Sequence, residues 1–150
     1  MEKIIDRINL LWAAAVTLFS YILGEHWYLF VAFLVLNVVD YITGIIKARM
    51  SHTENSNKGM RGIVKKVGYW VVIGIGFFIS VAFAEMGTII GIDLAFTQLF
   101  GWFTLATFLI NEIRSIFENL VKMGVYVPEF LTRGLEVAHK TIEGEESDSE

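Results

Sequence analysis

Four long apolar stretches alternate with short polar segments along this chain of 150 residues. The apolar stretches cover about residues 8–23, 27–46, 67–84 and 94–110. Each has roughly 16–20 residues, which is close to the ~20 apolar residues that a helix needs to cross a bilayer core. The pattern therefore predicts an all-α integral membrane domain over residues 1–110, with three to four transmembrane helices and four favoured.

The first stretch is the marginal span, because its ~16 residues would have to cross a core about 30 Å thick. No small-residue cleavage pattern of a signal peptide follows it, since the stretch ends in Ser20-Tyr-Ile-Leu-Gly24. We expect an uncleaved first span, and an interfacial or strongly tilted helix is the alternative.

All twelve Lys and Arg residues lie outside the apolar stretches, and the gaps at 24–26 and 85–93 contain none of them. Basic residues of short loops stay on the cytoplasmic side of a membrane. The C-terminus and the 47–66 segment are therefore expected inside, and so is the N-terminus if the chain has four spans. The expected inner loop carries a basic group composed of Lys47, Arg49, Lys58, Arg61, Lys65 and Lys66.

Composition supports a membrane protein, since 55% of the residues are hydrophobic and the mean hydropathy is +0.57. A soluble domain of this size could not bury that much apolar surface. The net charge of −4 owes much to residues 143–150, which hold five of the sixteen acids. We expect this end to form an acidic disordered tail.

The second stretch carries a polar face made of Asn37, Asp40 and Gly44. An Asp in the middle of a membrane helix costs about 2.5–3.5 kcal/mol, so such a residue usually faces protein or water. This face is a candidate pore-lining or assembly surface. The alternative is an Asp40 that only fixes helix packing, paired with Lys65 or Lys66 at the start of the third stretch.

Small and polar residues also line one side of the third and fourth stretches. Gly76, Ser80 and Ala84 recur at i+4 steps in the third, as in helices that approach each other closely, within one chain or between subunits. In the fourth stretch, a polar stripe includes Thr97, Gly101 and Thr104, with Asp93 and Asn111 at its ends. This stripe is a second candidate pore or assembly surface, and ordinary helix packing is the alternative.

Residues 111–142 are expected to form cytoplasmic or interfacial amphipathic helices. Gly124 should end the first helix and Pro128 should begin the second. Glu112 and Glu118 are expected to be solvated or paired with Arg114 and Lys122. The apolar stripes of the two helices are Ile113, Ile116, Phe117, Leu120 and Val121, then Leu131, Leu135, Ala138 and Ile142.

The chain offers little material for catalysis or cofactor binding. It has no Cys, and His26, His52 and His139 lack the spacing of metal ligands. A phosphate-binding glycine loop, a nucleophile–base pair and a pair of catalytic carboxylates are all missing from the sequence. We therefore expect no enzyme activity, no metal, no cofactor and no nucleic-acid partner.

Several ordered segments together resemble the phage holin family that includes clostridial toxin-release holins. They are Asp40-Tyr-Ile-Thr-Gly44, Lys47-Ala48, Gly59-Met-Arg-Gly-Ile-Val-Lys-Lys66, Asn111-Glu-Ile-Arg-Ser-Ile-Phe-Glu-Asn119 and Gly124-Val-Tyr-Val-Pro128. The resemblance covers about residues 27–140. Each segment alone is weakly specific, but the ordered set is fairly specific.

The resemblance implies a multi-pass protein of the bacterial cytoplasmic membrane that forms homo-oligomers in the lipid bilayer and permeabilises it. The released cargo would be an endolysin or a large protein toxin, without a need for direct binding. The alternatives are a small homo-oligomeric ion channel or transporter, and a membrane adaptor that recruits a soluble partner.

Overall fold

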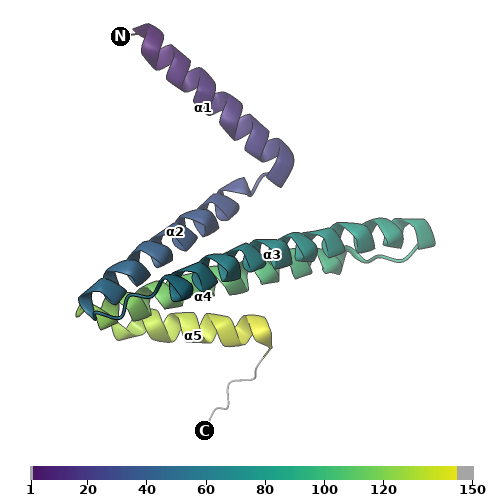
Figure 1. Ribbon diagram of the computed structural model, residues 1–150. Helices are drawn as coiled ribbons and strands as arrows, with labels where there is room; N and C mark the ends of the chain where they lie inside the picture. The colour runs from purple at the N-terminus through teal and green to yellow at the C-terminus, as the bar shows by residue number, and fades with distance from the viewer. Residues whose placement is uncertain (1, 145–150) are drawn as a thin grey trace. The chain divides into compact units, whose positions relative to one another are not determined.

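The computed structural model describes residues 2–144, and all regular structure in that range is helical (Figure 1). The all-α prediction is therefore confirmed for this range. Residues 145–150 of the predicted tail lie outside the described residues. The helices are α1 (Glu2–Leu23), α2 (Trp27–Met50), α3 (Ser56–Ile90), the short 3-10 helix η1 (Ala95–Thr97), α4 (Gln98–Lys122) and α5 (Glu129–Glu143).

Among the described residues, α2 and α3 are long and apolar enough to cross a membrane. The mean hydropathy over an 18-residue segment is 2.2 for α2 and 2.1 for α3. The prediction of three to four spans, including α1 and α4, stays a prediction. The α-helical part of the fourth apolar stretch is shorter than the predicted span 94–110. Residues Ala95–Thr97 form the 3-10 helix, and α4 begins only at Gln98. The part of α4 up to residue 110 is about 20 Å long at ~1.5 Å per residue.

The chain divides into two compact units, residues 1–35 and residues 36–150. In the first unit, α1 ends at a turn where Gly24 has a φ of 77° and its carbonyl accepts a hydrogen bond from the Trp27 amide. Leu10, Leu11 and Trp12 on α1 are each about 70% exposed. Apolar exposure of this extent is expected for a helix that contacts lipid or another chain.

In the second unit, the segment between α2 and α3 is much shorter than predicted. Only Ser51–Asn55 are non-helical, because Asn55 caps the start of α3: its side-chain oxygen accepts hydrogen bonds from the Asn57 amide (2.9 Å) and the Lys58 amide (3.4 Å). The prediction of a loop over the whole 47–66 segment is therefore wrong. Its basic residues lie on helices, with Lys47 and Arg49 on α2 and Lys58, Arg61, Lys65 and Lys66 on α3.

Helices α3 and α4 lie side by side along much of their length (Figure 1). Near one end the ring of Tyr69 stacks on Phe108, with 4.3 Å between the ring centroids. Further along, Gly101 lies against the ring of Phe77, and an added Cβ there would be 2.6 Å from that ring. Such close approach at a glycine brings the two backbones together, as in small-residue membrane packing.

Helix α5 folds back and packs against α4. As predicted, the first of the two C-terminal helices ends at a glycine, since Gly124 has a φ of 84° two residues after Lys122, the last residue of α4. Pro128 immediately precedes Glu129, the first residue of α5, which also agrees with the prediction.

Candidate functional site

A buried ion triad joins three helices of the second unit. The ammonium of Lys66 on α3 lies 2.8 Å from the carboxylate of Asp40 on α2 and also contacts the carboxylate of Glu112 on α4. Little of these side chains is exposed: 15% for Asp40, 16% for Lys66 and 4% for Glu112. The sequence suggested Lys65 or Lys66 as an ion-pair partner of Asp40, and the partner is Lys66. We call these residues the Lys66 triad.

A second group of contacts surrounds the side chain of Asn119 on α4. Its amide nitrogen donates to the carboxylate of Asp40 (3.0 Å) and to the hydroxyl of Thr43 (3.2 Å). Its amide oxygen accepts a hydrogen bond from the ammonium of Lys47 at 2.6 Å. One amide therefore bonds to three side chains of α2. Together with the Lys66 triad, Thr43, Lys47 and Asn119 form what we call the polar cluster.

The charges of the polar cluster balance, because the carboxylates of Asp40 and Glu112 are matched by the ammonium groups of Lys47 and Lys66. Glu112 lies two residues beyond the predicted fourth span. Burial raises the pKa of its carboxyl, while the hydrogen bond and positive charge of Lys66 act in the opposite direction. Lys66 is therefore what makes an ionised Glu112 tolerable in this position.

A polar cavity of about 310 Å³ borders the Lys66 triad. The cavity gives water a route to groups that are otherwise buried. Lys65 also borders it and lies over the ring of Tyr69, 5.6 Å from the centroid. The cavity is lined by Asp40, Gly62, Lys65, Lys66, Tyr69, Asn111, Glu112, Arg114, Ser115 and Glu118.

Helix α2 is attached differently from the others. The closest backbone packing in the second unit joins α3 to α4 and α4 to α5, whereas residues 40–47 of α2 reach α3 and α4 through the side chains of the polar cluster. Nearer its N-terminus, α2 also buries the ring of Phe33, which is 0% exposed. Gly44 illustrates the looser fit, since an added Cβ there would lie 3.8 Å from the Asn119 amide nitrogen, an ordinary contact distance. The cluster is thus a polar attachment between α2 and a tightly packed helix pair.

The small and polar residues of the third and fourth stretches meet each other in the α3–α4 contact. The hydroxyl of Ser80 accepts a hydrogen bond from the Gly101 amide at 3.1 Å. Thr97 donates to the carbonyl of Ser80 at 3.3 Å, and a Cβ on Gly76 would lie 3.0 Å from the hydroxyl of Thr104. These five residues therefore mediate packing within the chain. A pore-lining role for Thr97, Gly101 and Thr104 stays a prediction.

The remaining predicted residues are distributed around these contacts. Asn37 is 6% exposed on α2, one turn before Asp40. Ala84 is half-buried on α3. The structure thus brings Asp40 and Gly44 together at Asn119, and Gly76 and Ser80 together against α4.

Sequence considerations missed Glu112 and Asn119. Glu112 was expected to be solvated or paired with Arg114 or Lys122, which is wrong, because it is buried and contacts Lys66. Glu118 does pair with Arg114, at 3.3 Å. The available signal was the spacing: Glu112 and Asn119 share a helix face with the buried Leu105 and Ile116, at steps of seven, four and three residues.

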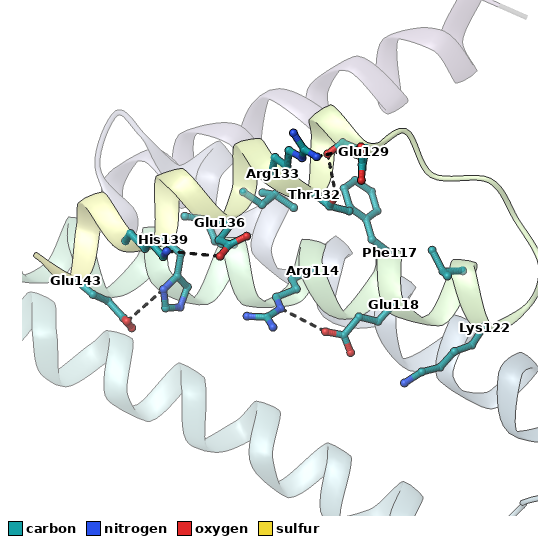
Figure 2. Close-up of a pocket in the computed structure, with 14 residues that line it drawn as sticks. Arg114, Phe117, Glu118, Lys122, Glu129, Thr132, Arg133, Glu136, His139 and Glu143 are labelled. Carbon is teal, nitrogen blue, oxygen red and sulfur yellow. Dashed lines mark hydrogen bonds and ion pairs between the residues drawn. The ribbon is translucent and has the colours of Figure 1, made fainter. Parts of the chain in front are cut away.

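A second hollow lies between α4 and α5 and has a volume of about 810 Å³ (Figure 2). Charged side chains of both helices line it, and they form ion pairs within their own helix: Arg114 with Glu118, Arg133 with Glu129, and Lys140 with Glu136. These side chains are largely exposed. Such i,i+4 surface pairs contribute only about 0.3–0.5 kcal/mol each, so this groove is weakly structured compared with the polar cluster.

Comparison with known proteins finds relatives that match most of the chain. An uncharacterized protein of Halalkalibacterium halodurans is 32% identical over 138 residues, covering 91% of this chain and 95% of the relative. An uncharacterized protein of Clostridium perfringens is 36% identical over 135 residues, covering 90% and 93%. No solved structure matches the chain.

A probable holin of Bacillus phage phi105 is 32% identical over 118 residues, covering 79% of this chain and 78% of the relative. Residues 17–140 match the bacteriophage holin family. That range contains the whole polar cluster and the α3–α4 contact. The chain belongs to the bacteriophage holin family.

Proposed function

We propose that this protein oligomerises in the bacterial cytoplasmic membrane and permeabilises it, so that an endolysin or a large protein toxin leaves the cell. Membership of the bacteriophage holin family and the similarity to a probable phage holin support this function. The cargo passes through the lesion and needs no binding site on the chain.

The observation that carries the proposal is the distribution of apolar and polar side chains on α2 and α3. Val38 on α2 and Val71, Ile75 and Phe78 on α3 are all more than half exposed. The polar groups Asp40, Thr43, Lys47 and Lys66 of these helices, by contrast, gather at the polar cluster, and Ser80 lies in the α3–α4 contact. Outer surfaces of this kind are stable only against lipid or against other copies of the chain, which is what a membrane-embedded oligomer provides.

In the proposed oligomer, the polar faces predicted from the sequence become the surfaces between copies or beside water. They are Asn37, Asp40 and Gly44 on α2, Thr97 on η1, and Gly101 and Thr104 on α4. In the single chain these faces are covered, because Asp40 is paired with Lys66 and Thr97 packs on Ser80. Assembly into a lesion would then require a rearrangement of helices, and not only an association of rigid chains.

The proposed topology follows from the basic residues. The turn at Ser51–Asn55 and the polar cluster lie on the cytoplasmic side, and the turn between α3 and α4 lies outside. The C-terminus is inside, and the N-terminus is inside if α1 spans the membrane. The opening would therefore be surrounded by a basic rim on its inner side.

The proposal is tested by inducible expression in a bacterium with and without a cytoplasmic endolysin. We expect abrupt loss of membrane potential in both strains, and lysis only in the strain with the endolysin. Continued growth of both strains at high membrane levels of the protein would contradict the proposal. An exported endolysin, which needs no lesion, serves as the control for enzyme activity.

One observation favours a second candidate, a membrane adaptor. Three large apolar side chains in and just before α5 are exposed: Tyr126 at 84%, Phe130 at 72% and Val137 at 65%. An adaptor could use these side chains to recruit a soluble partner. Deletion of residues 124–150 separates the two candidates, because a lesion-forming protein would still permeabilise the membrane and an adaptor would lose its activity.

A further inference from the structure

We propose that the polar cluster is a releasable latch, and that detachment of the inner half of α2 from the α3–α4 pair is the step that licenses membrane permeabilisation. The residues assigned to the latch are Asp40, Thr43 and Lys47 on α2, Lys66 on α3, and Glu112 and Asn119 on α4. This inference rests on the proposed function and adds a regulatory element to it.

The first argument is the contrast between two kinds of contact. The α3–α4 pair is held by close backbone approach, with Gly101 against Phe77 and Ser80 bonded to the Gly101 amide. Helix α2 is held at residues 40–47 by ion pairs and hydrogen bonds of long side chains. Lipid provides no hydrophobic force between helices, so polar side chains act as the adhesive there.

The second argument concerns cooperativity. Lys66 serves two carboxylates at once, and Asn119 bonds to Asp40, Thr43 and Lys47 at once. Loss of any one member leaves a buried charge or amide unmatched, so the contacts form and break as a unit. A unit of this kind has two discrete states, attached and detached, which is what a switch in a membrane protein requires.

The third argument concerns access. The polar cavity beside the Lys66 triad already reaches Asp40, Lys66 and Glu112. Water that enters there can solvate the separated charges once α2 moves, so that detachment exposes them to water and not to hydrocarbon. The detached α2 would then present Asn37 and Asp40 to other copies or to the lesion.

Single-cysteine reporters can test the latch, because the natural chain contains no cysteine. Gly44→Cys places a thiol beside Asn119 at the latch, and Ser80→Cys places one in the α3–α4 contact as the matched control. Each reporter is first checked for membrane accumulation and lysis. Thiol labelling with a small membrane-permeant maleimide is then followed in isolated membranes, without endolysin.

We expect Lys66→Met to raise the labelling rate at position 44 at least about tenfold and to leave the rate at position 80 nearly unchanged. Lys58→Met, at an exposed lysine of α3 that does not border the polar cavity, should leave both rates nearly unchanged. Equal acceleration at 44 and 80 would indicate general unfolding, and no acceleration at 44 would indicate that the cluster does not hold α2. Either result overturns the latch.

The apolar quadruple variant Asp40→Leu, Lys47→Met, Lys66→Met, Glu112→Leu guards against loss of folding, because it removes both carboxylates and both ammonium groups of the polar cluster. We expect it to accumulate like the natural protein and to permeabilise the membrane earlier at equal membrane levels. An unchanged or longer delay would overturn the latch, even if the labelling results agree with it. Absence of permeabilisation by the natural protein would instead refute the proposed function, while the labelling arm would still report whether α2 is held by the cluster.

Discussion

The ammonium of Lys66 on α3 lies 2.8 Å from the carboxylate of Asp40 on α2, two residues that are twenty-six positions apart and belong to different helices. The same ammonium contacts Glu112 on α4. One side chain thereby connects three helices of a membrane protein. Its position explains how two acidic residues are accommodated in mostly apolar helices, and it makes Lys66 the most informative residue to change.

Replacing Lys66 with Met should destabilise the protein by about 3 kcal/mol, because two largely buried carboxylates lose the cation that contacts both of them. The measurement is the free energy of unfolding in a mild detergent, from denaturant titration monitored by circular dichroism. Lys58→Met is the control, since that side chain is exposed on α3 away from the polar cavity and its effect should stay within about 0.5 kcal/mol. Equal losses for the two variants would show that the triad contributes nothing specific.

Replacing Asn119 with Leu should cost about 1–3 kcal/mol, because Asp40, Thr43 and Lys47 each lose a hydrogen-bond partner at a buried position. Asn111→Leu on the same helix is the control at a half-buried position. The same unfolding measurement applies to both variants. A stabilising effect of Asn119→Leu would mean that apolar contact with α2 outweighs the hydrogen bonds.

Gly101→Ala and Gly44→Ala should have opposite effects. At Gly101 the new methyl group would lie 2.6 Å from the ring of Phe77, so the α3–α4 contact must shift to make room for it. This overpacking should destabilise the protein by roughly 1–3 kcal/mol. At Gly44 the nearest atom is 3.8 Å away, so the higher helix propensity of Ala should be neutral or stabilising by up to about 1 kcal/mol.

The measurement for the glycine pair is thermal unfolding in detergent, together with the amount of protein in the membrane. Adding Phe77→Leu to Gly101→Ala should restore part of the lost stability, because it removes the ring that the methyl group meets. If Phe77→Leu adds its own full loss instead, the two residues are not in contact in the membrane.

Much of the helical order could be predicted from apolar length and from turn residues. Gly124 and Pro128 marked the end of α4 and the start of α5, since glycine readily adopts a positive φ and proline favours the beginning of a helix. The prediction of a loop up to residue 66 is wrong because a polar segment can form a helix once its first amides are capped. Asn55 satisfies the free amides of Asn57 and Lys58, and this cap lets a polar sequence start a helix.

The polar cluster could be predicted only in part. A pairing of Asp40 with Lys65 or Lys66 was the alternative to a pore-lining or assembly role, and the Asp40–Lys66 contact confirms the pairing, while the pore-lining or assembly role stays a prediction. Glu112 and Asn119 lie further along α4, in a segment with many polar residues. A charged residue in such a segment is expected to be solvated, so its presence does not indicate a buried partner. Their burial depends on how α4 is rotated against α3, which the apolar stripe of residues 113–121 did not predict correctly.

The membrane topology gives the last prediction, and it also addresses whether α1 spans. Single cysteines at Glu54 and Ile92, both on turns of the second unit, should label differently with a membrane-impermeant maleimide on intact spheroplasts. We expect Ile92→Cys to react from outside and Glu54→Cys to react only after the membrane is opened, because the basic residues flank position 54 and are missing around position 92.

Two further cysteines test whether α1 spans the membrane. Glu25→Cys should react from outside in either case. Glu2→Cys decides the number of spans: protection of position 2 indicates that α1 crosses the membrane, and labelling indicates that it lies on the outer surface. Reaction of Glu54→Cys in intact spheroplasts would reverse the proposed topology and place the polar cluster on the outer side.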